Sequence, residues 1–209
     1  MRCKSIGSQL ILLIGLAIIA TVPAAADKLP VDFPSCTVCH GDNVDGTREM
    51  NAPRLAGQNK TYLKHQLQSF KKGTRGYDPA DVHGSQMAAS AALLSEVSID
   101  RLASYISTLS PIYRQEKISG NISAGREFYR QNCADCHGFD AAGLEHLKTP
   151  NLKVLTAYDQ KHQMELYANG LRGSEFKSDI YAKWMRSASK HFNNTSEADN
   201  VIAYIHSLR

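Results

Sequence analysis

The pentapeptide Cys-x-x-Cys-His occurs twice in this chain and constrains its structure more than any other feature. The first copy spans residues 36–40 and the second spans residues 133–137, and a glycine follows each. This is the attachment pattern of a c-type haem: two thiols about one helical turn apart add to the two vinyl groups of one porphyrin, and the adjacent histidine then binds the iron. We therefore predict two covalently bound haem c groups, attached through Cys36, Cys39, Cys133 and Cys136, with His40 and His137 as iron ligands.

Two other uses of these cysteines were weighed. Four cysteines in an exported chain can form two disulfides, and two Cys-x-x-Cys pairs can hold one zinc ion. Neither explains a histidine directly after both pairs, and 97 residues separate Cys36 from Cys133. We expect haem attachment instead.

Residues 1–26 have the composition of a secretory signal peptide. A short basic start precedes an apolar run from Leu10 to Ala20, and three alanines stand before Asp27. The run is shorter than the roughly 20 residues that a membrane-spanning helix needs. We expect cleavage, loss of Cys3 with the signal, and a periplasmic location, while an uncleaved anchor or peripheral membrane association stays open.

The mature part of the chain is close to neutral. Removing Arg2 and Lys4 leaves 22 Lys and Arg residues against 20 Asp and Glu residues. There is no concentrated basic run, so charge gives no reason to expect nucleic-acid binding.

The mature chain reads as an internal repeat. In each half the pentapeptide is followed by a loop with proline and leucine, an amphipathic helix, an irregular stretch with one methionine, and a closing amphipathic helix. The middle helices are expected over 62–70 and 158–168, and the closing helices over 95–106 and 196–205, with Ser95 and Thr195 or Ser196 as N-caps. A proline- and glycine-containing linker places the boundary near Lys117, which gives a signal over 1–26, a first domain over 27–117 and a second domain over 118–209.

The repeat also assigns the second axial ligand of each iron. Met87 follows Cys36 by 51 residues, and Met185 follows Cys133 by 52. Thioether ligation raises the reduction potential above that of bis-histidine ligation, which suits a carrier. We predict Met87 and Met185 as axial ligands. The alternatives are Met50 and Met164, read as core residues, and His83 and His191, either of which would give a bis-histidine haem.

Several other residues have expected roles near the porphyrins. Arg75 and Arg172, each two residues after a glycine, are candidate partners for haem propionates. Four tyrosines are expected to bury their rings near the porphyrins: Tyr62, Tyr105, Tyr158 and Tyr204. The remaining histidines are read as surface or capping residues: His65, His146, His162 and His206.

With these residues in place, the chain resembles the cytochrome c4 family, periplasmic proteins with two class I cytochrome c domains in tandem. The resemblance rests on both Cys-x-x-Cys-His-Gly motifs, on residues 53–58 leading into Tyr62-Leu63, and on Met87 with the helix that ends at Tyr105. It implies an all-α fold of short helices around each haem. It also implies a role in passing electrons from a membrane quinol-oxidising complex to a terminal oxidase.

Two departures from that family stand out. The family usually has a full helix before each haem motif, and residues 124–130 supply one in the second half. Pro30 and Pro34 precede the first motif, so we expect the first domain to lack most of this helix. Its haem would then be more exposed or would offer a surface to a partner. Residues 186–191, after Met185, are also more polar than residues 88–92.

Two classes of function fit the sequence. In an electron carrier both irons are six-coordinate and no residue is catalytic. Such a protein binds its redox protein partners through small, transient surfaces. The alternative is the haem subunit of a periplasmic dehydrogenase that oxidises sulfur compounds or an alcohol. We predict the carrier.

Overall fold

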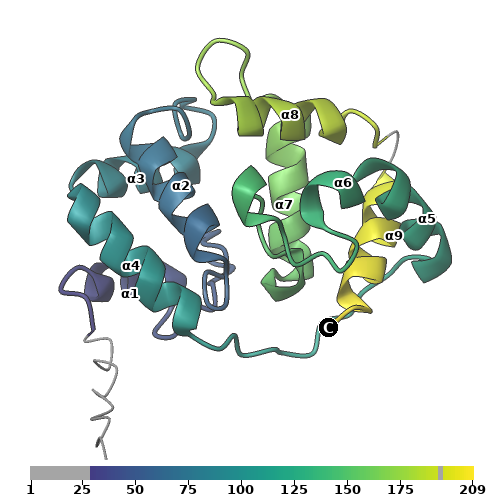
Figure 1. Cartoon of the computed structure of the whole chain (residues 1–209), viewed down its shortest axis with the longest axis horizontal. Coiled ribbons are helices and arrows are strands. Elements are labelled where there is room, and N and C mark those ends of the chain that lie inside the picture. Colours follow the sequence, from purple (N-terminus) through teal and green to yellow (C-terminus); the bar gives the residue numbers. More distant parts are fainter. Residues whose placement is uncertain (1–28, 193–194) are drawn as a thin grey trace, which may run out of the picture.

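The computed structural model describes residues 29–192 and 195–209, and over these residues the chain is all-α, as predicted. The helices fall into two lobes joined by a segment without helix over 109–121 (Figure 1). Within the described ranges the only strand-like pairing is an isolated bridge between Thr47 and Ala52. The signal-peptide prediction concerns residues 1–26, which lie outside the described part.

The first lobe contains the helices that surround the first pentapeptide. Helix α2 packs against both α3 and α4. Ser95 caps α4 as predicted, because its hydroxyl accepts a hydrogen bond from the Ser98 amide at 3.0 Å. The bounds are α1 (Phe33–His40), α2 (Lys60–Lys71), α3 (Val82–Ala92) and α4 (Glu96–Thr108).

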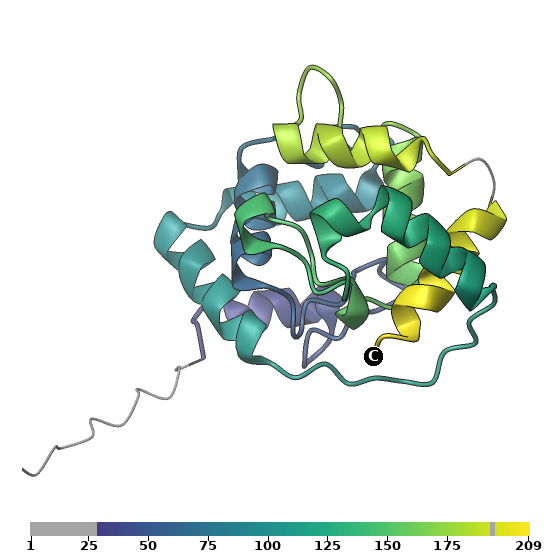
Figure 2. The same cartoon turned by 45° about the vertical axis from the view of Figure 1, so that its right-hand side comes forward.

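The second lobe is organised around the crossing of its first and last helices, visible in Figures 1 and 2. At this crossing a Cβ on Gly125 would lie 1.9 Å from the Asn200 carbonyl oxygen, so only glycine lets the two backbones approach so closely. The bounds are α5 (Ile122–Asn132), α6 (Ala134–His137), η1 (Glu145–Leu147), η2 (Leu152–Val154), α7 (Ala157–Ala168), α8 (Ile180–Ser189) and α9 (Thr195–His206).

The structure before each pentapeptide differs between the lobes, as the prolines predicted. In the described residues no helix precedes α1, which carries the first pentapeptide itself and has Pro34 in its first turn. Proline is tolerated there because the N–H it lacks would have had no intrahelical partner. The second lobe places α5 before the motif. In the first lobe Phe33 packs edge-on against Tyr105, with ring centroids 4.8 Å apart. In the second lobe Tyr129 on α5 packs at the corresponding place against the closing helix, where its ring contacts that of Tyr204.

Both methionine-containing stretches are helical, which corrects the expectation of irregular structure. Met87 lies in α3 and Met185 in α8. Each helix begins at an aspartate: Asp81 accepts a hydrogen bond from the Gly84 amide and Asp179 from the Ala182 amide, both at 2.9 Å. The aspartate caps favour helix in both elements, and the alanines of 88–92 add to this in α3; these were the signals present in the sequence.

The other predicted helices are confirmed with small shifts in their bounds. Helix α7 begins with a capping box in which the side chains of Thr156 and Asp159 each accept from the other's backbone amide. Helix α9 begins at Thr195, so the predicted caps Thr195 and Ser196 fall inside the helix. The residue before Thr195 lies outside the described ranges. No helix within 29–192 and 195–209 combines the length and the apolar composition needed to cross a bilayer.

Candidate functional site

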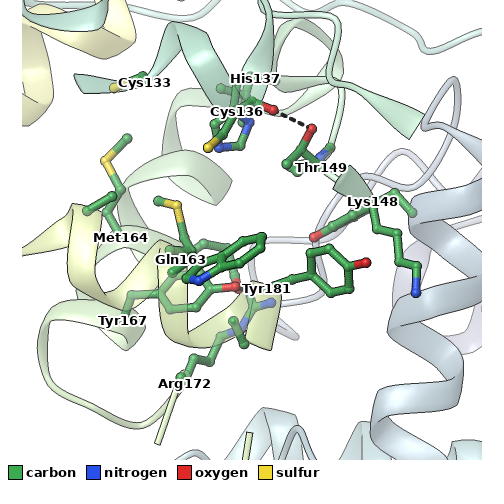
Figure 3. A pocket seen from close by; sticks show the side chains of 18 of the residues that line it. Cys133, Cys136, His137, Lys148, Thr149, Gln163, Met164, Tyr167, Arg172 and Tyr181 are labelled. Atoms are coloured by element: carbon green, nitrogen blue, oxygen red, sulfur yellow. Dashed lines mark hydrogen bonds between the residues drawn. The ribbon is translucent and has the colours of Figure 1, made fainter. Parts of the chain in front are cut away.

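A cavity in the second lobe, lined in part by side chains of the first lobe, gathers the residues predicted around the second haem, and we call it the second cavity. Cys133, Cys136, His137 and Met185 all line it. The empty space between the lining residues, with the open mouth included, is about 1430 Å³. Figure 3 shows the two cysteines and His137 on one side of this space. The arrangement offers two thiols and an imidazole to one flat ring, as haem attachment requires.

The competing ligands of the second site are distinguished by their positions. His191 is exposed and is not among the residues that line the cavity. Met164 does line it, at the left of the space and below Cys133 in Figure 3, and it also packs against the core cluster of the lobe. The structure therefore leaves two methionines in contact with the cavity and places His191 at the surface.

Both pentapeptide histidines are buried and held in the neutral form. Burial lowers the pKa of His40 and lowers the pKa of His137 to about 4, against the opposing effect of the Pro53 and Pro150 carbonyls. His40 Nδ1 lies 2.8 Å from the Pro53 oxygen. Because a carbonyl can only accept a hydrogen bond, Nδ1 of His40 carries the proton. Nε2 of His40 then keeps a free lone pair, which is the form of imidazole that binds iron.

The first site shows why His83 is a poor competitor for Met87. His83 Nε2 lies 2.8 Å from Asn51 Nδ2, and the Asn51 amide is oriented by Tyr158, whose hydroxyl donates to Asn51 Oδ1. The Asn51 amide thus engages Nε2 of His83. Met87 is half-buried in the middle of α3 and has no such engagement.

No disulfide joins any of the four cysteines in the described residues. Burial raises the pKa of Cys133 to about 12, with Cys136 adding to the effect, and burial also raises the pKa of Cys36. The two pairs lie in separate lobes, so the four sulfurs do not converge on one ion. Among residues 29–192 and 195–209, no group of three or more His, Cys, Asp or Glu side chains is placed to hold a metal.

Arg75 and Arg172 meet across the boundary between the lobes. Arg75 donates to Gln66 Oε1 at 2.6 Å and to Gln163 Oε1 at 3.3 Å. Arg172 donates to the same two oxygens, at 3.2 Å for Gln66. Each arginine thus bonds the glutamine of its own lobe and that of the other, in an arrangement we call the arginine–glutamine ring. Its members repeat at 97 residues, like the pentapeptides, which was the sequence signal for it.

The arginine–glutamine ring has the electrostatics of an anion site. None of the ion pairs in the described residues involves Arg75 or Arg172, and both Nε atoms are buried without a hydrogen-bond partner. Burial and the neighbouring Arg172 lower the pKa of Arg75 to about 10. All four ring residues line the second cavity. Spare N–H donors there fit the carboxylates of haem propionates, so the residues present suit the predicted group.

Arg54, a residue of the 53–58 motif, holds the lobes together. It is 3% exposed, and it donates through Nη1 to the Val154 carbonyl at 2.9 Å and through Nη2 to the Ile112 carbonyl at 2.7 Å. Its Nε lies 3.3 Å from Asp45 Oδ1. One guanidinium thereby joins the first lobe, the linker and the second lobe. This structural role was missed from the sequence.

His65 also reaches across the boundary, which corrects its reading as a surface or capping residue. Its Nε2 lies 3.2 Å from Asp179 Oδ2, which also accepts from the Ser69 hydroxyl at 3.1 Å. Burial alone would raise the pKa of Asp179, but hydrogen bonds from His65, the Ala182 amide and Ser69 hold it well below its usual range. The N-cap of α8, the helix that contains Met185, is therefore tied to the first lobe.

Replacing Asp179 with asparagine tests this tie, because asparagine keeps the cap and removes the charge. At pH 7 we expect the free energy of unfolding to fall by roughly 1.5–3 kcal/mol, the range for a hydrogen bond to a charged group. A carboxylate with a depressed pKa contributes stability above its unfolded pKa of about 3.9 and loses it as the pH falls further. The difference between wild type and variant in denaturant titrations should therefore shrink below about pH 4. An equal difference at pH 3 and pH 7 would contradict this.

Comparison with known proteins agrees with this geometry. The family model of cytochrome c matches residues 30–110 and again 122–209. A cytochrome c-552 of Acidithiobacillus ferridurans is 31% identical over 146 residues, 65% of this chain and 62% of its own. Cytochrome c4 of Azotobacter vinelandii is 38% identical over 82 residues, 39% of this chain and 38% of its own. The chain thus aligns with less than two thirds of these two relatives.

Two further proteins are similar over more of the chain. A thiosulfate dehydrogenase electron acceptor of Thiomonas intermedia is 27% identical over 169 residues, 76% of this chain and 74% of its own. The solved structure of Acidithiobacillus ferrooxidans cytochrome c4 superposes with a TM-score of 0.66 at 27% identity, covering 83% of this chain and 98% of that one. The similarity therefore extends over both lobes.

Proposed function

This chain belongs to the cytochrome c family, in the tandem arrangement of cytochrome c4, and carries two covalently bound haem c groups; from that premise we propose that it is a periplasmic electron carrier between a respiratory donor complex and a terminal oxidase or another acceptor. When bound, each haem supplies a one-electron iron couple. The observation that supports the proposal most is the second cavity, where attachment cysteines, a neutral histidine and methionine face one space. We also propose cleavage after residue 26 and domains over 27–117 and 118–209.

We propose His40 and Met87 as axial ligands in the first domain, and His137 and Met185 in the second. Neutral, buried imidazoles support the histidines. The pairing of His83 with Asn51 favours Met87, and the exposure of His191 favours Met185. With an imidazole and a thioether on each iron, no coordination position would remain open for a substrate. The role of the chain's own residues is then to bind, orient and shield the haems.

A redox titration of the purified mature protein, followed by visible spectra, tests the carrier function. We expect two haems per chain, reversible one-electron couples at positive potential, and a Met–iron absorption band in the oxidised state. Tight carbon monoxide binding by the reduced protein without denaturant would instead indicate an open iron and catalysis.

A second candidate function is the electron-accepting haem subunit of a periplasmic dehydrogenase. The likeness to a protein named as the electron acceptor of thiosulfate dehydrogenase favours it. The same two haems would then relay electrons from a fixed enzyme partner. Co-purification of the native protein with a dehydrogenase, at constant stoichiometry, would decide for the subunit.

Gly76 offers a test of the Met87 assignment. Its φ is +70°, and a Cβ there would lie 2.2 Å from the Gly84 carbonyl in α3; Gly173 has the same relation to α8, with 2.5 Å to the Ala182 carbonyl. Gly76→Ala should push α3 away and weaken the Met–iron band of the first haem, at a stability cost of at least about 1 kcal/mol. Gly73→Ala, also at positive φ but with nothing within 4 Å, is the matched control. An unchanged spectrum in Gly76→Ala would count against Met87.

Arg75 should set the potential of the second haem from the other lobe, because it lines the second cavity. A positive charge favours the reduced form of a haem, so Arg75→Gln should lower that potential, by an amount on the order of tens of millivolts. Spectropotentiometry on the variant measures the shift. Arg101→Gln, an exposed change in the same lobe, should leave both potentials in place.

A further inference from the structure

We propose that the outer face of α8, together with the loop over 174–178 before it, is the docking surface for a redox protein that presents acidic residues around an apolar patch. The proposal rests on the carrier function and adds to it the chemistry of one partner and the lobe that the partner meets. We call this face the α8 surface, made of Phe176, Lys177, Ile180, Lys183, Trp184 and Lys190.

Three apolar side chains of the α8 surface are strongly exposed. Phe176 is 95% exposed, Ile180 50% and Trp184 51%. Ile180 and Trp184 are four residues apart on one helix and so share a face. The loop with Phe176 projects from the lobe ahead of α8 in Figures 1 and 2. Neighbouring aromatic side chains that are this exposed to solvent are characteristic of protein interaction sites.

Trp184 connects this surface to the haem site. Its indole is half exposed, yet it is among the residues that line the cavity with Cys136 and Met185. A partner seated over Trp184 would therefore lie against the wall of the second cavity. That position shortens the path for electron exchange, which an apolar patch elsewhere on the lobe would not do.

The charges around the patch are mostly basic, and no carboxylate pairs with them in the described residues. Lys177 and Lys190 are exposed and Lys183 is partly buried. The Lys177 ammonium lies 5.9 Å from the centroid of the Tyr77 ring, a contact that keeps its charge, and no ion pair in the described residues involves any of the three lysines. Of the two nearby acids, Glu175 is exposed, and Asp179 is engaged by His65. Lysines that no carboxylate neutralises, placed around an apolar centre, attract a partner with acidic residues in matching positions.

The corresponding face of the first lobe differs in charge. Residues 77–93, around α3, contain no lysine or arginine, and their acids are Asp78 and the buried cap Asp81. Val82 is exposed there, as Ile180 is in α8. The same kind of apolar residue is thus present without the basic rim. Electrostatic complementarity therefore directs an acidic partner to the second lobe, and this asymmetry carries the proposal.

The test measures electron transfer from the fully reduced holoprotein to a small acidic blue-copper protein by stopped flow. We expect Lys177→Glu with Lys183→Glu to lower the second-order rate constant about 10-fold at low ionic strength, with the difference nearly gone at high salt. Phe176→Ala, in the exposed loop, should lower it several-fold at every salt concentration. Val82→Asn at the start of α3 and Asp78→Lys in the turn before it are the matched controls and should change it less than 2-fold.

Several results would overturn the docking surface. These are unchanged rates in the α8 variants, equal losses in the α3 variants, or no electron transfer to the copper protein from a wild type that titrates as two reversible haems. Self-association of the wild type that is abolished by Lys177→Glu would assign the surface to a second copy. Binding to phosphatidylserine vesicles, lost in the lysine variants while the rate to the copper protein is kept, would assign it to lipid. A failed redox titration would overturn the carrier function instead.

Discussion

Replacing Met185 with leucine should remove about half of the Met–iron absorption of the oxidised protein and lower one of its two potentials. Leucine has a similar volume but no donor atom, so the fold is retained while the second iron loses its thioether. Because axial ligands move haem potentials over roughly 0.8 V, a fall on the order of 0.1 V or more is expected. One haem per chain should then bind carbon monoxide.

Met164→Leu is the matched control, because Met164 lines the same cavity and packs against the lobe's core. It should keep both Met–iron signals and cost less than about 1.5 kcal/mol. His191→Ala should be spectroscopically silent, since this histidine is exposed. Loss of the band in Met164→Leu, with Met185→Leu unaffected, would exchange the two assignments.

Replacing Arg54 with alanine should destabilise the protein by about 3–5 kcal/mol, the cost of leaving a buried charge pair without one partner. The substitution removes the guanidinium partner of three groups at once: Asp45 and the carbonyls of Ile112 and Val154. Since these belong to both lobes and the linker, we expect unfolding to split into two transitions. Calorimetry measures both effects, and hydrogen exchange should speed up at the contact between the lobes.

Two variants separate this role from general effects of lost charge. Arg54→Lys keeps the charge but lacks the planar fork that serves several acceptors at once, so it should recover only part of the stability. Arg101→Ala, at an exposed position of α4, should change stability by no more than about 0.5 kcal/mol. A single transition and a loss below about 1 kcal/mol in Arg54→Ala would mean that the lobes are held together elsewhere.

The helices were predictable where their signals are local. Apolar spacing and caps placed α2, α4 and α7 nearly at their observed bounds. The helices around Met87 and Met185 were missed because these stretches were expected to be irregular, although an aspartate cap begins each helix. Caps and alanine content were the better guide, since they act on the backbone itself.

The contacts between the lobes were not predictable in the same way. The 53–58 motif was noted as a family feature, but nothing in it says that Arg54 reaches the carbonyls of Val154 and Ile112. His65 was read as a surface residue, although it meets Asp179 from 114 positions away in the chain. Such pairs depend on how two folded units pack, and a single sequence contains no periodicity that reports it.

By itself the sequence determined that two haems are bound and that the fold is helical and duplicated, and it predicted which cysteines and histidines hold them. Covalent attachment and helix formation depend on residues within one or two turns, so short patterns suffice to specify them. Only the tertiary structure decided that the two arginines share their glutamines across the lobes, that Met164 joins Met185 at the cavity, and that α8 presents a basic, aromatic face. These features arise from packing between distant segments, where burial and mutual orientation determine what each side chain can reach.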